Sequence, residues 1–296
     1  MDPLFFFGAW YTLDVSRRSP NVAKLSTKYP GSALITGASA GLGEAFARRC
    51  ASEGMDLVLV ARRQSRLELL AERLKQDYHV NVLVVVADLS KPGAPESIKE
   101  ACDAAGVTVS LLINNAGFGS HARFHETELQ WQSAIVDVNV KAPTVLTGLF
   151  LPGMVERGKG GVVFLASTAA YQPAPMLAVY GASKAYNRML GEALYSELKP
   201  CGIDVLSLSP GYTATEFHNV AQVKRLPPME MFRKPDQVVD TCFRTLGKQP
   251  AVIDKVTPFQ AFMARVHRKL SRWQAALGAS MFTGLLAYAG DVFAAL

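Results

Sequence analysis

The feature that most constrains this fold is a short apolar run that passes directly into a glycine-rich turn. Residues 32–35 read Ser-Ala-Leu-Ile, and residues 36–43 read Thr-Gly-Ala-Ser-Ala-Gly-Leu-Gly before a helical pattern begins. Glycines at such a junction let the backbone approach a pyrophosphate, and the following helix directs free N–H groups toward that anion. Tight strand-to-helix turns also need glycine without binding anything, so the turn gains weight only from its context.

The same alternation of buried strand and helix continues along the chain. Strand-like runs follow at residues 57–61, 81–86, 109–113, 161–166 and 203–208, separated by helical patterns that include 65–77, 93–105 and 128–155. No Asn-Gly hairpin joins the runs, so we expect an α/β fold with a doubly wound parallel sheet and helices on both faces. Ligands of such sheets bind beyond the carboxyl ends of the strands. The residues expected to line this crevice are Thr36, Arg62, Asp88, Asn114, Ser167 and Pro210.

The end of the second strand predicts which dinucleotide would bind. About twenty residues after the glycine turn, where a ribose-reading acidic residue is expected, the chain carries Arg62 and Arg63. Guanidinium groups attract a 2′-phosphate and can bind it through two parallel hydrogen bonds, whereas a carboxylate would repel it. The pair therefore favours NADP(H), although a surface arginine beside a helix-entry arginine is the simpler reading.

The stretch from Ser167 to Lys184 carries the groups needed for proton transfer. The strand-like run ends at Ser167, and a helical pattern from about residue 178 places Tyr180 and Lys184 on one face, one turn apart. An ammonium beside a phenol stabilises phenolate and is expected to lower the pKa of Tyr180, while the Ser167 hydroxyl can bond the same substrate oxygen. By itself, a Tyr-x-x-x-Lys spacing is weak evidence for a catalytic site, because a solvated lysine often lies near a half-buried tyrosine on a helix.

Taken together and in this order, the motifs resemble the short-chain dehydrogenase/reductase superfamily. They are Thr36-Gly37-x-x-x-Gly41-x-Gly43, Asp88, Asn114-Asn115-Ala116-Gly117, Asn139, Ser167, Tyr180-x-x-x-Lys184 and Pro210-Gly211, and they cover about residues 30–255. The resemblance implies a Rossmann-type sheet of about seven strands in the short, single-domain branch. Within the family, the chain is similar to microsomal-type 3-oxoacyl-CoA and 17β-hydroxysteroid reductases, which also carry Lys-Tyr before the first strand, as Lys28-Tyr29 does here.

The resemblance also implies a role for each motif residue. Tyr180 would be the acid/base, Lys184 would hold the nicotinamide ribose, Ser167 would polarise the carbonyl and Asn139 would support a proton-relay water. Asp88 would contact adenine, the Asn114 segment would line the adenosine side and Thr215 would lie near the nicotinamide amide. The implied NADP(H) residues are Gly37, Ser39, Ala40, Gly41, Leu42, Gly43, Arg62, Arg63, Asp88, Leu89, Asn114, Asn115, Ala116, Gly117, Tyr180, Lys184, Pro210, Gly211, Thr213 and Thr215. Family members often pair through the helices that carry Asn139 and Tyr180, which implies a homodimer or homotetramer.

The net charge and the cysteine pattern indicate which classes of binding partner and which compartment to expect. The chain has 296 residues, 49% of them hydrophobic, and a net charge of +6. That charge suits an anionic partner such as nucleotide phosphates, coenzyme A or a lipid surface, and an ordinary lysine surplus explains it equally well. Nothing beyond the charge favours nucleic acid. The four cysteines, Cys50, Cys102, Cys201 and Cys242, form no C-x-x-C pair, which predicts reduced thiols and a cytoplasmic protein without a metal site.

Both ends of the chain extend beyond the family motifs. We expect an apolar arm and connector over residues 1–30, the NADP-binding domain over 31–256 and a helical extension over 257–296. Residues 259–273 repeat apolar side chains at helical spacing among arginines and lysines, and residues 274–290 lack charge. Such a tail fits a substrate lid, a subunit contact or a membrane contact, so peripheral attachment through residues 1–11 and 259–296 stays open.

The expected activity is NADPH-dependent reduction of a hydrophobic ketone or aldehyde. The loops over residues 119–126 and 213–233 are expected to cover the crevice. Apolar side chains in or beside them are Phe118, Phe124, Met176, Leu177, Tyr212, Phe217, Met229, Met231 and Phe232. Two alternatives remain: an NADP-linked alcohol or hydroxysteroid dehydrogenase that works in the oxidative direction, and a non-catalytic NADP-binding sensor.

Overall fold

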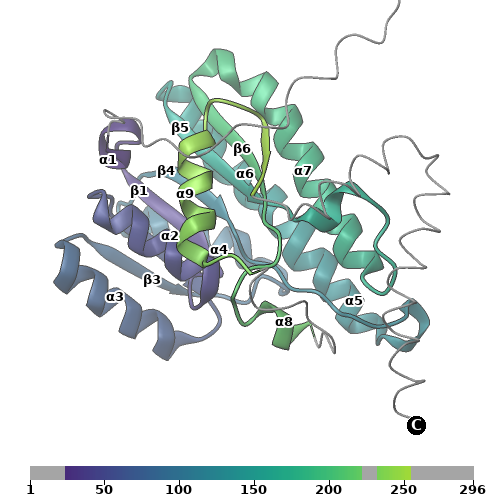
Figure 1. The fold of residues 1–296 in the computed structure, drawn as a ribbon. Helices are drawn as coiled ribbons and strands as arrows, with labels where there is room; N and C mark the ends of the chain where they lie inside the picture. The colour runs from purple at the N-terminus through teal and green to yellow at the C-terminus, as the bar shows by residue number, and fades with distance from the viewer. Residues whose placement is uncertain (1–23, 222–231, 255–296) are drawn as a thin grey trace, which may run out of the picture.

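A computed structural model describes residues 24–221 and 232–254 of the chain (Figure 1). Within these residues, seven strands form one parallel sheet in the order β3-β2-β1-β4-β5-β6-β7. The strands are β1 (Ser32–Thr36), β2 (Leu57–Ala61), β3 (Val82–Val86), β4 (Val109–Asn114), β5 (Gly160–Leu165), β6 (Ile203–Ser209) and β7 (Ala251–Ile253). The predicted doubly wound sheet is confirmed, and its order reverses between β1 and β4.

Helices cover both faces of the sheet because successive strand residues point to opposite sides. One core packs Ala33 and Ile35 of β1 against α2 (Gly41–Ser52), α3 (Gln64–Tyr78) and α9 (Pro235–Thr245). The other packs Leu34 against α4 (Ala94–Ala104), α6 (Ala142–Glu156) and α7 (Ala178–Leu198). Shorter elements are α1 (Leu25–Lys28), η1 (Phe124–Glu126), α5 (Leu129–Val136), η2 (Asp137–Lys141), η3 (Thr168–Tyr171), η4 (Lys199–Cys201) and α8 (Phe217–Val220).

The core takes in residues that precede the first strand. Leu25 and Tyr29 are buried, and the Tyr29 hydroxyl donates to Asp204 of β6 at 2.7 Å. The sequence predicts a connector at the end of residues 1–30, whereas the structure has the short helix α1 there. Leu25 anchors this helix in the core, although the lysines around it in the sequence, Lys24 and Lys28, suggest a polar segment.

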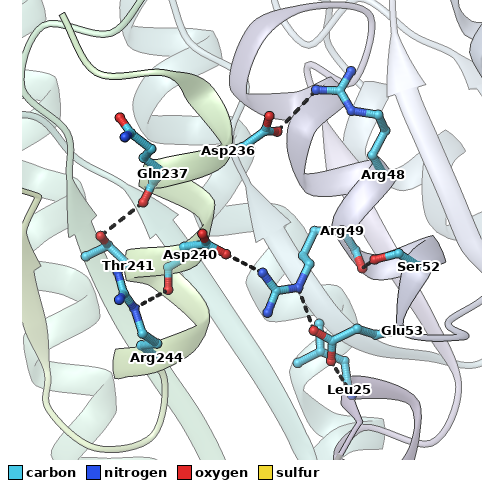
Figure 2. A network of polar contacts seen from close by, with 10 residues as sticks. All are labelled: Leu25, Arg48, Arg49, Ser52, Glu53, Asp236, Gln237, Asp240, Thr241 and Arg244. Atoms are coloured by element: carbon cyan, nitrogen blue, oxygen red, sulfur yellow. Dashed lines mark hydrogen bonds and ion pairs between the residues drawn. The ribbon is translucent and has the colours of Figure 1, made fainter. Parts of the chain in front are cut away.

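Ion pairs hold α9 against α2 on the outside of the first core (Figure 2). Arg48 bonds Asp236 at 3.3 Å, and Arg49 bonds both Asp240 and Glu53. Glu53 also accepts the Leu25 backbone N–H at 3.0 Å, so one chain of contacts joins α1, α2 and α9. The helix that starts at the glycine turn is thereby fixed along its length.

The helical pattern predicted over residues 128–155 is continuous but not uniform. It consists of α5, the π-helical turn η2 and α6. Among the described helices, this run is long and apolar enough to cross a bilayer, and 44% of its most apolar window is buried inside the protein. A core helix of a soluble protein meets the same criterion, and the burial here is against the second core.

The expected terminal segments lie outside the described residues. They are the apolar arm at residues 1–11 and the helical extension at 257–296, and Met229 and Met231 of the expected crevice lining also lie outside.

Candidate active site

The carboxyl ends of the parallel strands meet at one edge of the sheet, and the predicted site residues lie there. Thr36 and Asn114 end β1 and β4, the two strands between which the sheet order reverses. Open α/β sheets bind ligands at this switch point. Ser167 follows β5, and Pro210 follows β6, so the predicted site residues span four neighbouring strands.

The three glycine positions of the turn have no room for a side chain. Gly37 and Gly41 have positive φ values of 67° and 59°. A Cβ on Gly43 would lie 2.2 Å from the backbone oxygen of Gly37, which cannot move without reshaping the turn. The turn is therefore a bare backbone cradle at the N-terminus of α2, the arrangement that binds a pyrophosphate.

The turn is held in place by the end of β4. The hydroxyl of Thr36 accepts the backbone N–H groups of Asn115 and Ala116 at 3.0 and 2.9 Å. The side-chain amide of Asn115 donates to the backbone oxygen of Thr36 at 2.7 Å. These bonds use the Asn115 amide within the protein, so this residue supports the cradle from behind.

The predicted arginines lie beside the cradle, and one of them contacts it. Arg63 donates two hydrogen bonds, from Nε and from one terminal nitrogen, to the Ser39 hydroxyl of the glycine turn at 3.1 and 3.0 Å. Arg62 is exposed and lies close enough to Asp88 for its charge to act on that carboxyl. Burial alone would raise the pKa of Asp88, but hydrogen bonds from Ser90 and the Arg62 charge outweigh it and lower the pKa.

Asn114 and Leu89 are buried residues of the predicted cofactor site. The Asn114 side-chain amide donates to Thr147 at 3.2 Å, but no described group bonds its Oδ1 atom. Leu89, the residue after Asp88, is buried in the second core. An orphaned buried oxygen at the switch point fits a bound ligand that supplies a donor.

Tyr180 and Ser167 are in contact at the centre of the crevice. Tyr180 is buried on the first turn of α7, and its phenol is hydrogen-bonded to the Ser167 side chain. Burial raises the pKa of Tyr180 to about 12, and the Ser167 bond offsets only part of that rise. The expectation of a lowered tyrosine pKa is therefore wrong for this structure, because desolvation of the phenolate outweighs its stabilisation by neighbours.

Lys184 lies one turn further along α7, and its ammonium is also buried. Its Nζ atom donates to the backbone oxygen of Leu165 at 2.7 Å and lies 5.8 Å from the centre of the Tyr180 ring. Burial lowers the pKa of Lys184 to about 8. A Cβ on Gly117 would lie 3.0 Å from Nζ, so glycine at this position allows the segment after β4 to approach α7 closely.

Asn139 joins the π-helical turn η2 to both neighbouring elements. Its amide nitrogen donates to the Phe118 backbone oxygen at 2.9 Å and to the Ser183 hydroxyl at 3.0 Å. Its Oδ1 atom accepts the Phe118 N–H at 3.1 Å. The side chain thus fixes the loop after β4 against α7.

The segment after β6 closes over the glycine turn. The Pro210 backbone oxygen accepts the N–H of Thr168, which ties this segment to the turn that carries Ser167. The Thr213 hydroxyl donates to the Gly211 backbone oxygen at 3.1 Å. A Cβ on Gly41 would lie 2.9 Å from the Thr215 side chain, so Thr215 packs directly on the cradle.

Aromatic rings gather beside Tyr180. The ring centres of Phe217 and Tyr180 are 5.2 Å apart, and those of Tyr212 and Phe232 are 5.7 Å apart. Further along, Phe118 packs edge-to-face on Trp131. The loop over 119–126 is tied to these walls, since Ala122 donates to the Met176 backbone oxygen and His121 to that of Ala221.

Sequence reasoning missed two charged residues of this region. Glu216 bonds Arg63 at 2.7 Å and Arg66 at 2.6 Å, bridging the segment after β6 and the start of α3. Arg66 follows Arg63 at helical spacing, which was the available signal, whereas nothing local marks Glu216 as a partner of residues about 150 positions earlier. Among the described residues, no group of three or more His, Cys, Asp or Glu side chains could hold a metal ion.

Comparison with known proteins identifies the type of site. The family model for "short chain dehydrogenase" matches residues 32–225. The chain is 28% identical over 245 residues to the very-long-chain 3-oxoacyl-CoA reductase of Bos taurus, covering 81% of this chain and 76% of that protein. It is 34% identical over 240 residues to the human inactive hydroxysteroid dehydrogenase-like protein 1, covering 73% and 70%.

A solved structure has the same architecture. A short-chain dehydrogenase from Sphingobium yanoikuyae in complex with NADPH superposes with a TM-score of 0.71 at 31% identity, covering 81% of this chain and 93% of that one.

Proposed function

The chain belongs to the short-chain dehydrogenase family, and from that premise we propose that it reduces a hydrophobic ketone or aldehyde with NADPH. It is an NADP(H)-dependent oxidoreductase of this family, similar in fold to a relative solved with NADPH. The observation that carries the proposal is the convergence of Ser167, Tyr180 and Lys184 beside a bare glycine cradle. One relative is named inactive, so similarity alone does not distinguish an enzyme from a non-catalytic protein. The presence of Ser167, Tyr180 and Lys184 is therefore the feature that favours catalysis in this chain.

The chain offers a fitting group for each part of the dinucleotide. The cradle from Gly37 to Gly43 would receive the pyrophosphate, and Arg62 and Arg63 would receive the 2′-phosphate. Lys184 would bond the nicotinamide ribose, and Thr215, which packs on the cradle, would lie toward the nicotinamide. When bound, NADPH supplies the hydride.

The protein residues would handle the proton and the developing charge. Because burial raises the Tyr180 pKa to about 12, the phenol is protonated at neutral pH, and this is the form that an acid needs for reduction. Tyr180 would donate its proton to the carbonyl oxygen while Ser167 hydrogen-bonds the same oxygen. The Lys184 ammonium would stabilise the phenolate left behind. Asn139 would hold the loop after β4 and α7 in register for this transfer.

The substrate class follows from the walls of the crevice. Phe217 packs against the Tyr180 ring, and Tyr212 and Phe232 add a second aromatic contact in the segment after β6. Such rings favour a long or bulky apolar carbonyl compound over a small polar one. The name of the bovine relative, a very-long-chain 3-oxoacyl-CoA reductase, supports a long-chain 3-oxoacyl thioester as the first class to test.

An NADPH-oxidation screen tests this proposal. The panel would hold long-chain 3-oxoacyl thioesters, ketosteroids, retinal-like aldehydes and small aryl ketones, with acetoacetyl-CoA as the matched short-chain control. We expect oxidation with at least one bulky apolar class and little with acetoacetyl-CoA. A chain that binds NADPH but oxidises it with no carbonyl compound, and reduces NADP⁺ with none of the matching alcohols, would be a non-catalytic binder.

We also propose that the protein forms a homodimer or homotetramer through α5 and α7. Leu129 and Val136 on α5 and Met189 on α7 are large apolar side chains that lie exposed, and α5 and α7 are neighbours in the fold. Sedimentation should give a dimer or tetramer, and Met189→Glu should shift it toward monomer. A wild-type monomer would contradict this assignment.

A cytoplasmic location is proposed on the state of the cysteines. All four are free, and Cys50, Cys102 and Cys242 are buried, which suits a reducing compartment. Fractionation at high salt without detergent tests it: protein that remains in the membrane pellet would contradict a purely cytoplasmic location and favour peripheral attachment.

A further inference from the structure

Glu216 forms ion pairs with two arginines at the edge of the proposed cofactor site. Its two carboxylate oxygens bond Arg63 at 2.7 Å and Arg66 at 2.6 Å. Glu216 lies one residue after Thr215, whose side chain packs on the glycine turn. Arg63 lies two residues beyond the end of β2, where the ribose is expected, and donates to Ser39 of the same turn. The carboxylate therefore lies where an anionic group of the cofactor is expected.

We propose that Glu216 is a specificity-determining residue that competes with the 2′-phosphate of NADP(H) for the guanidinium groups of Arg63 and Arg66. The inference rests on the proposed function, in which Arg63 receives that phosphate. It adds that the protein carries its own occupant for the site and that the phosphate must exchange with it.

The hydrogen bonds of Arg63 explain why exchange is required. A guanidinium group binds an anion best through two parallel N–H bonds along one edge. One edge of Arg63, formed by Nε and one terminal nitrogen, is used by Ser39, and the other terminal nitrogen is used by Glu216. A phosphate therefore cannot take either edge in full while these partners stay in place. Of the two partners, only Glu216 carries a charge that repels the phosphate.

The bonds to Glu216 are weak enough to be exchanged. The three side chains are 42–49% exposed, and ion pairs with such exposure contribute little because water and salt screen them. The pKa of Glu216 is lowered chiefly by its hydrogen bonds from Arg63 and Arg66, so the group stays ionised at neutral pH. A dianionic phosphate replaces it at modest cost.

The consequence is a reduced preference for NADPH over NADH. Removing the Glu216 charge should tighten binding only where a 2′-phosphate is present. We expect Glu216→Gln to lower the dissociation constant for NADPH roughly three- to tenfold, the factor that corresponds to losing exposed ion pairs of this kind. Binding of NADH should change less than twofold, and the NADPH gain should shrink as salt is raised.

The test compares wild type, Glu216→Gln and Glu68→Gln by fluorescence titration with NADPH and NADH. Glu68 is an exposed carboxylate on α3, hydrogen-bonded by Gln64 at 2.7 Å, so its variant removes the same charge from the same region without releasing an arginine. The wild-type titration with NADPH serves as the separate test of the proposed function.

Each result of these titrations either supports or contradicts the proposed competition between Glu216 and the 2′-phosphate. Tighter NADPH binding in Glu216→Gln alone supports the inference. Equal or weaker NADPH binding in that variant, an equal gain for NADH, or the same gain in Glu68→Gln would overturn it while the proposed function stands. A wild-type chain that binds neither dinucleotide would overturn both.

Discussion

Replacement of Lys184 by methionine should stabilise the fold while removing activity. The side chain is 4% exposed, and burial lowers its pKa from 10.5 to about 8. Such a shift corresponds to ~3 kcal/mol of free energy that folding loses by burying the ammonium. Methionine has a similar length and no charge, so it removes this penalty. It also loses the bond to the Leu165 backbone oxygen, which costs about 1 kcal/mol.

The sign of the pH dependence follows from the direction of the shift. Below pH 8 the lysine is charged in both states, and the full penalty is present. Between pH 8 and 10.5 the unfolded chain keeps the proton that the folded chain has released. The free energy of unfolding of the wild-type protein therefore increases as the pH rises through this range. The variant should therefore be more stable by about 2 kcal/mol at pH 7, and its advantage should vanish by about pH 10.

Urea unfolding of wild type and Lys184→Met at pH 7 and at intervals to pH 10 measures this difference. Ionisation of cysteines and tyrosines affects both proteins and cancels. Lys141→Met, which removes an exposed charge from η2, is the control and should change the free energy of unfolding by less than about 0.5 kcal/mol at every pH. A Lys184→Met variant that is less stable at pH 7, with a difference independent of pH, would refute the reasoning.

Two glycine substitutions test the cradle and the close approach of the segment after β4 to α7. Gly43→Ala forces a Cβ against the Gly37 backbone oxygen and should weaken NADPH binding about five- to a hundredfold in a titration, since strain of about 1–3 kcal/mol falls on the turn itself. Gly117→Ala presses on the Lys184 ammonium and should lower turnover more than it lowers NADPH affinity. Gly153→Ala, whose Cβ would meet only the end of the Arg157 side chain, is the control, and a similar loss in it would contradict both expectations.

The sheet and the crevice could be predicted because their signals are local. Five of the strand-like runs match β2 to β6 within one residue at each end, and the glycine turn falls between β1 and α2 as expected. Once the strands are parallel, their carboxyl ends must share an edge, so residues such as Thr36 and Ser167 come together without any knowledge of contacts.

Elements that depend on distant contacts could not be placed. The strand β7 has only three residues, Ala251–Ile253, and is a strand because β6 pairs with it. The π-helical turn that carries Asn139 leaves no mark in the apolar pattern. Leu25 was hidden among basic residues, although it is buried in the core.

Electrostatics was the least predictable part of the site. The spacing of Tyr180 and Lys184 indicates a favourable charge, but the sequence does not show how deeply each group is buried, and burial decides both pKa shifts. The bridge from Glu216 to α3 likewise depends on the path of the segment after β6.

The most direct test of the proposed chemistry is turnover of Tyr180→Phe with an accepted carbonyl substrate, measured alongside NADPH affinity. The phenol is the proposed acid, so the variant should bind NADPH as wild type does and lose about 10²–10⁴-fold in turnover. Tyr195→Phe is the control on the same helix, because its hydroxyl bonds only the exposed Lys199 among the described contacts, and it should keep full turnover. Full turnover in Tyr180→Phe would contradict the proposed mechanism.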